Sequence, residues 1–460
     1  MKNITRTTTI LALLLTAAPA ISAQSVVATS ATRAVADSQP TAKDPFAFAD
    51  FTWLNGNSRQ KFSVLDTKAF TGEFRADVSY IAQFNHPKDH TLVGSSESGR
   101  TSEFQLQQLG IGGDFHYGQA RGRLMTQFGM YSTMTPRNDA SPGRGQWDLG
   151  NAYRYISEAY GGYHWNKLNG INLDAGIFMS YIGLFSYYNF DNWAYQPSYV
   201  SSNTPWFFNG LRLQIFTSDK LKIEPWLING WQSYGMFNST PGVGGQILWR
   251  PTGSVSVLSN NYYGRDWLGI PDRRRVHTDN SIEIKYHDNP ARFYSKGAFS
   301  LTADAGCESG GGVACRGSSG LNPAQNFLGA MLYNRSWFNK DVIGLTLGGG
   351  GMINPGRYLV LLPPINGATA FSGTPYFTEN PGDKFKAWDA SATLDYMPDQ
   401  FTTFRFELNH RAANVPYFAG SGGVTPPGGN TGTAGSLVPG WTPDLVKTET
   451  RFNLALLVKF

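Results

Sequence analysis

Histidines are the side chains best suited to acid–base catalysis or metal binding near neutral pH, and the chain has seven of them. None stands in a motif that resembles a catalytic nucleophile with its base, or a set of metal ligands. His86 and His90 flank Pro87-Lys88-Asp89 and form only a weak candidate metal pair. The glycine run at 348–351 lacks the Lys-Ser/Thr of a phosphate-binding loop. We therefore expect no enzymatic activity, no metal and no cofactor, and keep a hydrolase as a minor alternative.

Charged residues recur instead at alternate positions of several segments, where the side chains of a strand would share one face. That face carries both signs of charge. In a water-filled lumen these groups would stay hydrated and partly paired, and their field would orient polar solutes; a merely solvated inner wall explains the same pattern. Arg121, Arg123 and Arg154 fall on neighbouring predicted strands and form the best basic patch. The full set of candidate lumen and selectivity residues is Arg75, Asp77, Arg121, Arg123, Arg154, Glu158, Arg212, Glu283 and Lys285.

The densest run of charge is Arg273-Arg274-Arg275, in a predicted loop after Gly264. If this loop folds inward, the run lies at the mouth of a pore and attracts anions. If it points outward, it would bind the phosphates of lipopolysaccharide. A solvated loop without a partner is the third interpretation.

The only two cysteines, Cys307 and Cys315, lie in a glycine-rich segment. In an exported chain this spacing favours a disulfide bond. Free thiols or half of a metal site remain alternatives, although no histidine stands close to either cysteine in the sequence.

The composition separates the possible fold classes. The chain has 460 residues, of which 15% are charged and 14% aromatic, and its mean hydropathy is −0.29. Beyond the N-terminus there is no apolar run of about 20 residues, as a membrane-spanning helix requires. A disordered chain would lack the aromatic residues. A membrane β-barrel fits, because only alternate residues of its strands face lipid.

The N-terminus reads as a secretory signal peptide over residues 1–23. Lys2 and Arg6 precede an apolar core, and small residues at 18–23 allow cleavage after Ala20 or Ala23. Removing this segment lowers the formal net charge of +5 by two, because it contains two basic residues and no acidic one. The remaining charge is too small and too evenly spread to indicate a nucleic-acid partner.

The last segment is a strand in which apolar and polar residues alternate up to Phe460. Phe452, Leu454 and Leu456 share its apolar face with Phe460. A final strand that ends on phenylalanine resembles the signal read by the barrel-assembly machinery of Gram-negative bacteria. An ordinary amphipathic strand is the alternative.

Alternation of this kind recurs along the chain and predicts about sixteen strands, with fourteen or eighteen as the neighbouring possibilities. Short turns alternate with long loops rich in glycine, proline and asparagine, as in outer-membrane barrels. The even strand number places both barrel ends on the periplasmic side. The predicted strands are 70–84, 108–117, 120–130, 153–165, 171–180, 206–216, 221–233, 243–250, 254–264, 276–287, 292–303, 325–337, 342–354, 385–397, 401–411 and 447–460.

The chain therefore divides into a signal peptide (1–23), an N-terminal extension (24–69) and an outer-membrane barrel (70–460). The extension could form an extra strand, stay in the periplasm or enter the lumen, and its sequence does not choose between these.

The segment Ala49-Asp50-Phe51-Thr52-Trp53-Leu54-Asn55-Gly56, the strand Phe70–Tyr80 and the order of strands down to Phe460 resemble the OmpL-like beta-barrel porin-2 family. The resemblance covers nearly the whole mature chain and rests on structural motifs. It implies an outer-membrane porin and supplies no functional residues to transfer.

We expect passive diffusion of small hydrophilic solutes or ions through a water-filled lumen, which a sixteen-strand barrel leaves open. A surface adhesin or binding scaffold that uses the long outer loops is the alternative. The expected partners are outer-membrane lipid, lipopolysaccharide, the barrel-assembly machinery and small polar solutes. The oligomeric state and the ion preference stay open.

Overall fold

The structure is a computed structural model that describes residues 45–136, 139, 141–317, 324–356, 358, 363–369 and 384–460. The predicted signal peptide at 1–23 and the first part of the predicted extension lie outside these described residues. Within them, no helix is both long and apolar enough to cross a membrane.

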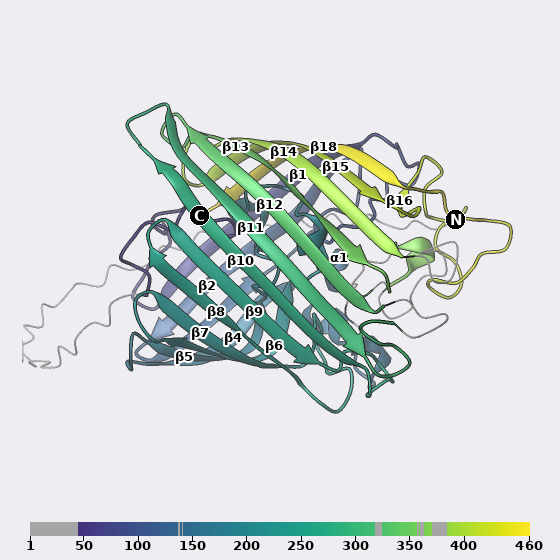
Figure 1. Cartoon of the computed structure of the whole chain (residues 1–460), viewed down its shortest axis with the longest axis horizontal. Coiled ribbons are helices and arrows are strands. Elements are labelled where there is room, and N and C mark those ends of the chain that lie inside the picture. The colour runs from purple at the N-terminus through teal and green to yellow at the C-terminus, as the bar shows by residue number, and fades with distance from the viewer. Residues whose placement is uncertain are drawn as a thin grey trace, which may run out of the picture. The chain divides into compact units, whose positions relative to one another are not determined.

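Sixteen antiparallel strands form one closed barrel, which confirms the predicted fold class and strand number (Figure 1). Neighbours in the sequence are neighbours in the sheet, and the first and last strands pair to close it. The barrel strands are β1 (Phe70–Gln83), β2 (Phe104–Tyr117), β3 (Ala120–Thr126), β4 (Ile156–Trp165), β5 (Ile171–Met179), β6 (Phe207–Phe216), β7 (Leu221–Ile228), β8 (Gly242–Thr252), β9 (Val255–Gly264), β10 (Arg274–Asp288), β11 (Tyr294–Ser309), β12 (Asn326–Phe338), β13 (Ile343–Asn354), β14 (Phe385–Tyr396), β15 (Thr402–Ala413) and β18 (Thr448–Lys459).

Alternation of side chains explains why these segments form a barrel wall. In β14, Trp388 and Leu394 are exposed on the outside, while Asp389 and Asp395, each the next residue along the strand, are buried inside. Apolar residues on the lipid face and polar residues on the inner face are what a membrane barrel requires. A shift of one residue in register would turn every polar side chain toward lipid, so the pattern also fixes the register.

The connections differ at the two ends of the barrel. Short turns, such as the two residues between β2 and β3, join the strands at one end, and long loops join them at the other. Figure 1 marks the C-terminus at the short-turn end, where the main chain of Phe460 pairs with Phe74 of β1. The long loops carry the short helices α1 (Tyr131–Met134), α2 (Leu149–Tyr153) and α3 (Tyr199–Ser202), and the small strand pair β16 (Phe418–Ala419) and β17 (Leu445–Val446).

Several strand ends differ from the sequence prediction by a few residues, and two of them have a local cause. Strand β7 ends at Ile228 instead of 233, because the Asn229 side chain donates to the Tyr234 carbonyl oxygen at 2.7 Å and folds the chain into a loop. Strand β3 ends at Thr126 instead of 130, because a register shift against β4 follows Met125. Both changes lengthen loops at the same end of the barrel.

Candidate functional site

The long loop between β5 and β6, residues 180–206, folds into the lumen; we name it the inward loop. Asn189 and the Tyr195 hydroxyl of this loop donate to the Asp77 carboxylate of β1, at 2.9 and 3.0 Å. Two strands further along the same side of the barrel, the main-chain N–H groups of Tyr195 and Gln196 donate to Glu407 of β15, at 2.5 and 2.9 Å. The loop therefore leaves the wall between β5 and β6 and is fixed to the side of the barrel formed by β1 and β15.

Arg405 of β15 makes the most extensive contact between the wall and the inward loop. Its guanidinium donates to the carbonyl oxygens of Asn189, Asn192 and Ala194 at 3.0, 2.5 and 3.2 Å. The same group pairs with Asp395 of β14 at 2.7 Å. A rigid fork of donors suits such multiple recognition, because the five N–H groups of arginine have fixed directions.

Aromatic side chains fill much of the space around the inward loop. Trp193 of the loop packs edge-to-face on Trp337 of the wall, and Phe185 packs in the same way on Tyr333. All four residues are buried. The lumen is therefore narrower than the sequence-based expectation of an open sixteen-strand interior, because a loop between two strands fills part of it.

Arg123 of β3 is the centre of a charged cluster on the inner wall. Its guanidinium contacts the carboxylates of Glu73, Asp114 and Glu158 at 3.0, 2.7 and 2.9 Å. Arg75 extends the cluster, since it pairs with Glu73 and with Asp191 of the inward loop. Arg75, Arg123 and Glu158, which were predicted to face the lumen, therefore lie together on the inner wall. Their charges are neutralised by ion pairs with one another and with neighbouring carboxylates.

Arg121 makes fewer ion pairs than Arg123 does. Its one ion pair, with Asp174 of β5, is longer at 3.3 Å, and 27% of its side chain is exposed. Arg212 of β6 takes the other oxygen of Asp174 at 2.9 Å and is buried. Of the predicted basic patch, Arg121 is thus the residue whose charge is most available to a passing solute.

Arg154 lies elsewhere than predicted. Helix α2 ends at Tyr153 with Arg154 as its C-cap, and β4 begins only at Ile156, so Arg154 is not part of the strand. Its guanidinium lies over the ring of Tyr155 and donates to the hydroxyl of that residue at 2.8 Å, in an exposed position. Because Tyr155 is on the outer face with Phe128, we correct the expectation that Arg154 lines the lumen.

The arginine run at 273–275 is divided between two environments. Strand β10 already begins at Arg274, so only Arg273 belongs to the predicted loop. Arg273 lies over the Trp267 ring at 4.2 Å, and Arg274 is exposed. Arg275 points inward and pairs with Asp266 at 3.4 Å and Glu308 at 2.8 Å. Alternation along the strand separates the three charges, so they cannot act as one patch.

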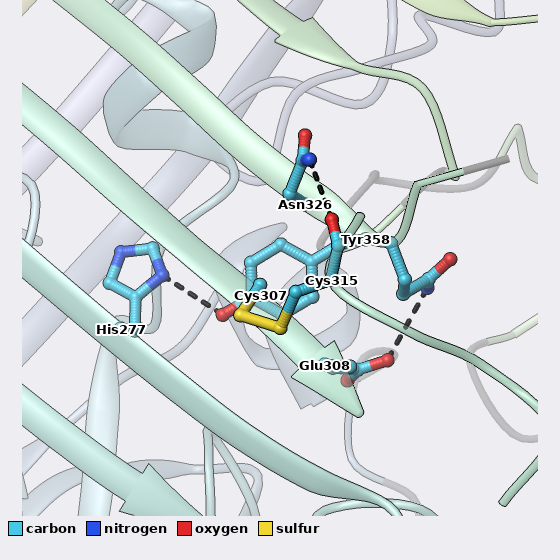
Figure 2. The surroundings of a disulfide bond; sticks show 7 residues. His277, Cys307, Glu308, Cys315, Asn326 and Tyr358 are labelled. Atoms are coloured by element: carbon cyan, nitrogen blue, oxygen red, sulfur yellow. Dashed lines mark hydrogen bonds between the residues drawn. A yellow bond between two sulfur atoms is a disulfide. The ribbon is translucent and has the colours of Figure 1, made fainter. Parts of the chain in front are cut away.

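Cys307 and Cys315 form the predicted disulfide bond at the end of β11 (Figure 2). Asn326 of β12 donates to the Cys315 carbonyl oxygen at 2.8 Å and ties the bridged segment to the next strand. His277 and Tyr358 lie beside the bridge and are hydrogen-bonded at 2.9 Å. In the part of the chain that the structure describes, no three His, Cys, Asp or Glu side chains form a metal-binding group.

Two acidic groups connect the long loops to one another. Burial acts to raise the pKa of Asp89, but hydrogen bonds from the Thr425 hydroxyl and the Val424 N–H outweigh it and keep this pKa below its usual 3.8. Burial raises the pKa of Asp139, against hydrogen bonds from Ser141 and Ser233. The carboxylates of Asp89 and Asp139 thus accept hydrogen bonds from loops that are distant in the sequence, and they hold these loops together.

A cavity of about 310 Å³ opens at the short-turn end, between β2 and β5. His164 of β4 lies between two amide oxygens there, those of Asn172 at 2.7 Å and Asn166 at 2.8 Å. The alternating pattern places His116 and His164 on the polar face of their strands, but sequence reasoning did not single them out as site residues. The polar residues that line the cavity are Asp114, His116, Gln119, Arg121, His164 and Asn172.

The comparisons with known proteins agree with this architecture. The family model described as beta-barrel porin-2, OmpL-like, matches residues 71–439. The chain belongs to this family and is an outer-membrane β-barrel porin. Its sequence finds no match among curated proteins.

Solved structures of bacterial outer-membrane proteins are similar to the chain at low identity. An anion-selective porin from Comamonas acidovorans is 11% identical, with a TM-score of 0.48 over 85% of this chain and 99% of that chain. OprB of Pseudomonas putida is 11% identical, with a TM-score of 0.47 over 85% and 94%. OmpT of Vibrio cholerae is 10% identical, with a TM-score of 0.46 over 87% and 100%.

Proposed function

We propose that small hydrophilic solutes and ions cross this porin by passive diffusion along the side of the lumen formed by β2, β3, β4 and β5. The cavity at the short-turn end, which Arg121 and His164 line, is the observation that carries this proposal. The inward loop is bonded to β15 through its main chain, and it reaches β4 through the Tyr188 hydroxyl, which donates to Glu158 at 2.7 Å. None of these loop contacts is part of the lining of the cavity. Diffusion along a hydrated wall needs no catalytic group, so the proposed function is not enzymatic.

Both signs of charge along this route predict a weak ion preference. Arg123 and Arg75 are neutralised by the carboxylates that surround them, so they add little net field. Arg121 is partly exposed at the rim of the cavity and has one long ion pair, so its positive potential would act on entering anions. We therefore expect a modest preference for anions that weakens as salt screens the charge.

Reversal of charge at Arg121 tests the route. Arg121→Glu is expected to shift the reversal potential toward cations in planar bilayers, more strongly at about 0.01 M than at 0.1 M salt, since the Debye length falls from about 30 to 10 Å. Arg154→Glu is the matched control, because Arg154 lies outside the lumen. An equal shift in both variants, or none in Arg121→Glu, would show that solutes do not pass this rim.

We further propose how the chain reaches the outer membrane. Residues 1–23 act as a cleaved signal peptide, residues 24–69 as an extension, and residues 70–460 as the barrel that the assembly machinery inserts. Outside the cell, the half-buried Arg273 and the exposed Arg274 suit the phosphates of lipopolysaccharide, because both lie at the long-loop end.

Loss of the terminal ring should slow assembly. Phe460 stacks on Phe74 at 4.9 Å between ring centroids and completes the pairing of the last strand with β1. In Phe460→Ala we expect slower appearance of the heat-modifiable barrel band on gels, with the final barrel little changed. Phe452→Ala, on the same face of β18, is the control and should assemble at the normal rate. Equal rates in both variants would count against an assembly signal at Phe460.

A further inference from the structure

The described part of the N-terminal extension crosses the short-turn end of the barrel; we name residues 45–61 the strap. Its first contact is with the β6–β7 turn, where the Phe46 N–H donates to the Asp219 carbonyl oxygen at 3.0 Å. Further along, the Trp53 indole N–H donates to the Gly253 carbonyl oxygen in the β8–β9 turn, at 3.1 Å. The strap thus runs along the rim of the mouth, from one turn to the next.

The far end of the strap is bound to the opposite rim. Arg59 donates to the carbonyl oxygens of Asp399 and Thr402 at the β14–β15 turn, at 2.5 and 2.6 Å. Burial, with the nearby charge of Arg335, lowers the pKa of Arg59 to about 10, so it stays charged at neutral pH. These attachment points lie on the turns between β6 and β15, whereas the cavity described above lies between β2 and β5.

The centre of the strap is bonded to the tip of the inward loop. The N–H of Trp193 donates to the Asn55 side-chain oxygen at 2.9 Å, and its indole N–H donates to the Trp53 carbonyl oxygen at 3.2 Å. The Gly56 N–H donates to the Asp191 carbonyl oxygen at 3.1 Å. Gly56 has a φ of +75°, and a Cβ there would lie 2.7 Å from the Leu184 carbonyl oxygen, so the close approach requires glycine.

The way the strap is attached suggests that it can be released. No residue of the strap belongs to a strand of the described barrel, so its contacts are separate hydrogen bonds and buried side chains instead of a continuous ladder. Trp53 and Asn55 are 2% and 4% exposed, and both accept hydrogen bonds from Trp193 of the inward loop. Segments held at separate points open locally at lower free energy than segments paired within a sheet.

We propose that the strap is a gate at the short-turn mouth: it holds the tip of the inward loop through Trp53 and Asn55, and its release lets the loop move and widens the pore. This gate rests on the proposed porin function, since it regulates the same lumen. Glu283 and Lys285, predicted above as selectivity residues, act within this gate. Glu283 accepts the Asn55 N–H at 2.8 Å, and the Lys285 ammonium lies 5.8 Å from the centroid of the Trp53 ring.

Truncation of the central side chain tests the gate in single-channel recordings of the full-length protein. Trp53→Ala removes a buried ring and its bond to the turn, so we expect the ratio of wide to narrow conductance states to rise by at least about tenfold. Val64→Ala is the control, because Val64 belongs to the same N-terminal segment and is 50% exposed. If Trp53→Ala interferes with folding, Asn55→Ala replaces it, because this change removes a single side-chain acceptor.

A thiol reporter measures the loop without relying on conductance. Ala194 of the inward loop is fully buried, and both natural cysteines are bonded to each other, so Ala194→Cys provides a unique thiol. Labelling by a water-soluble maleimide should be at least about tenfold faster when Ala194→Cys is combined with Trp53→Ala than when it is combined with Val64→Ala.

The two readouts separate this gate from the porin function itself. Faster labelling together with wider conductance supports the gate. Faster labelling without any conductance, in wild type or variant, supports the latch between strap and loop but refutes the porin function. Labelling and conductance unchanged from the Val64→Ala control would overturn the gate, and the strap would then be a fixed part of the wall.

Discussion

Replacing Arg405 by glutamine is expected to release the inward loop from the barrel wall, raise the single-channel conductance severalfold and make the current noisier. Arg405 is the one residue described here whose side chain bonds to three carbonyl oxygens of the loop at once. Its removal also leaves Asp395 with Arg335 as its remaining basic partner in the wall. Loss of one partner from a buried ion pair costs about 3–5 kcal/mol.

Arg405→Lys separates the charge of this group from its geometry. Lysine keeps a positive charge near Asp395 but cannot reach three carbonyl oxygens in fixed directions. We expect Arg405→Lys to keep most of the stability and still show the larger, noisier current. Wild-type conductance in both variants would mean that the loop holds its place without Arg405.

Replacing Arg123 by glutamine is expected to destabilise the barrel by about 3–5 kcal/mol. The change leaves Glu73, Asp114 and Glu158 close together without the guanidinium that they share. Carboxylates gathered in this way repel one another, and two of them, Glu73 and Glu158, are largely shielded from solvent, whereas Asp114 is half exposed. The measurement is a urea titration of the folded barrel in detergent, followed by gel mobility.

Arg121→Gln is the control for Arg123→Gln, because it removes the same charge two residues away, on the same face of β3. Its single ion pair is long and partly exposed, so we expect a loss of about 1 kcal/mol or less. Similar losses in the two variants would show that the ion pairs of Arg123 add nothing to stability beyond those of a solvated wall.

Local alternation accounts for how well the barrel itself could be predicted. In β1, polar Asp77 and Ser79 alternate with Val78 and Tyr80, and this alternation predicts both the strand and its inner face. A disulfide between Cys307 and Cys315 was also predictable, because it depends on local spacing and on export. Such features can be predicted because they depend only on residues close in sequence and on the contrast between lipid outside the barrel wall and water inside it.

The inward loop and the strap could not be predicted in the same way, because their contacts join residues far apart in the sequence. Tyr195 and Asp77 are 118 residues apart, and Asn55 and Glu283 are 228 apart. Sequence patterns alone assign a long connection between strands to the outside, although the inward loop carries aromatic residues such as Phe185 and Trp193 that are buried inside the barrel. Alternation gives the face of a charged residue but not its partner, as Arg121 and Arg123 show.

Arg154 shows a different limit. The alternating pattern extends across it, yet Asp148 caps helix α2 by accepting the N–H of Asn151 at 3.0 Å, and the helix runs up to Arg154. Capping of a short helix competes with the strand pattern at this point. The side chain therefore leaves the inner face that simple alternation assigns to it.

The most direct test of a diffusion route along β2–β5 is single-channel recording with a thiol at the rim. His164→Cys places it on the wall of the cavity, and Tyr163→Cys places it on the outer face of the same strand. Both variants should show stepwise conductance in planar bilayers, and a charged methanethiosulfonate reagent should reduce the current only in His164→Cys. Absence of conductance from folded barrels, or equal responses in the two variants, would contradict a pore along this side.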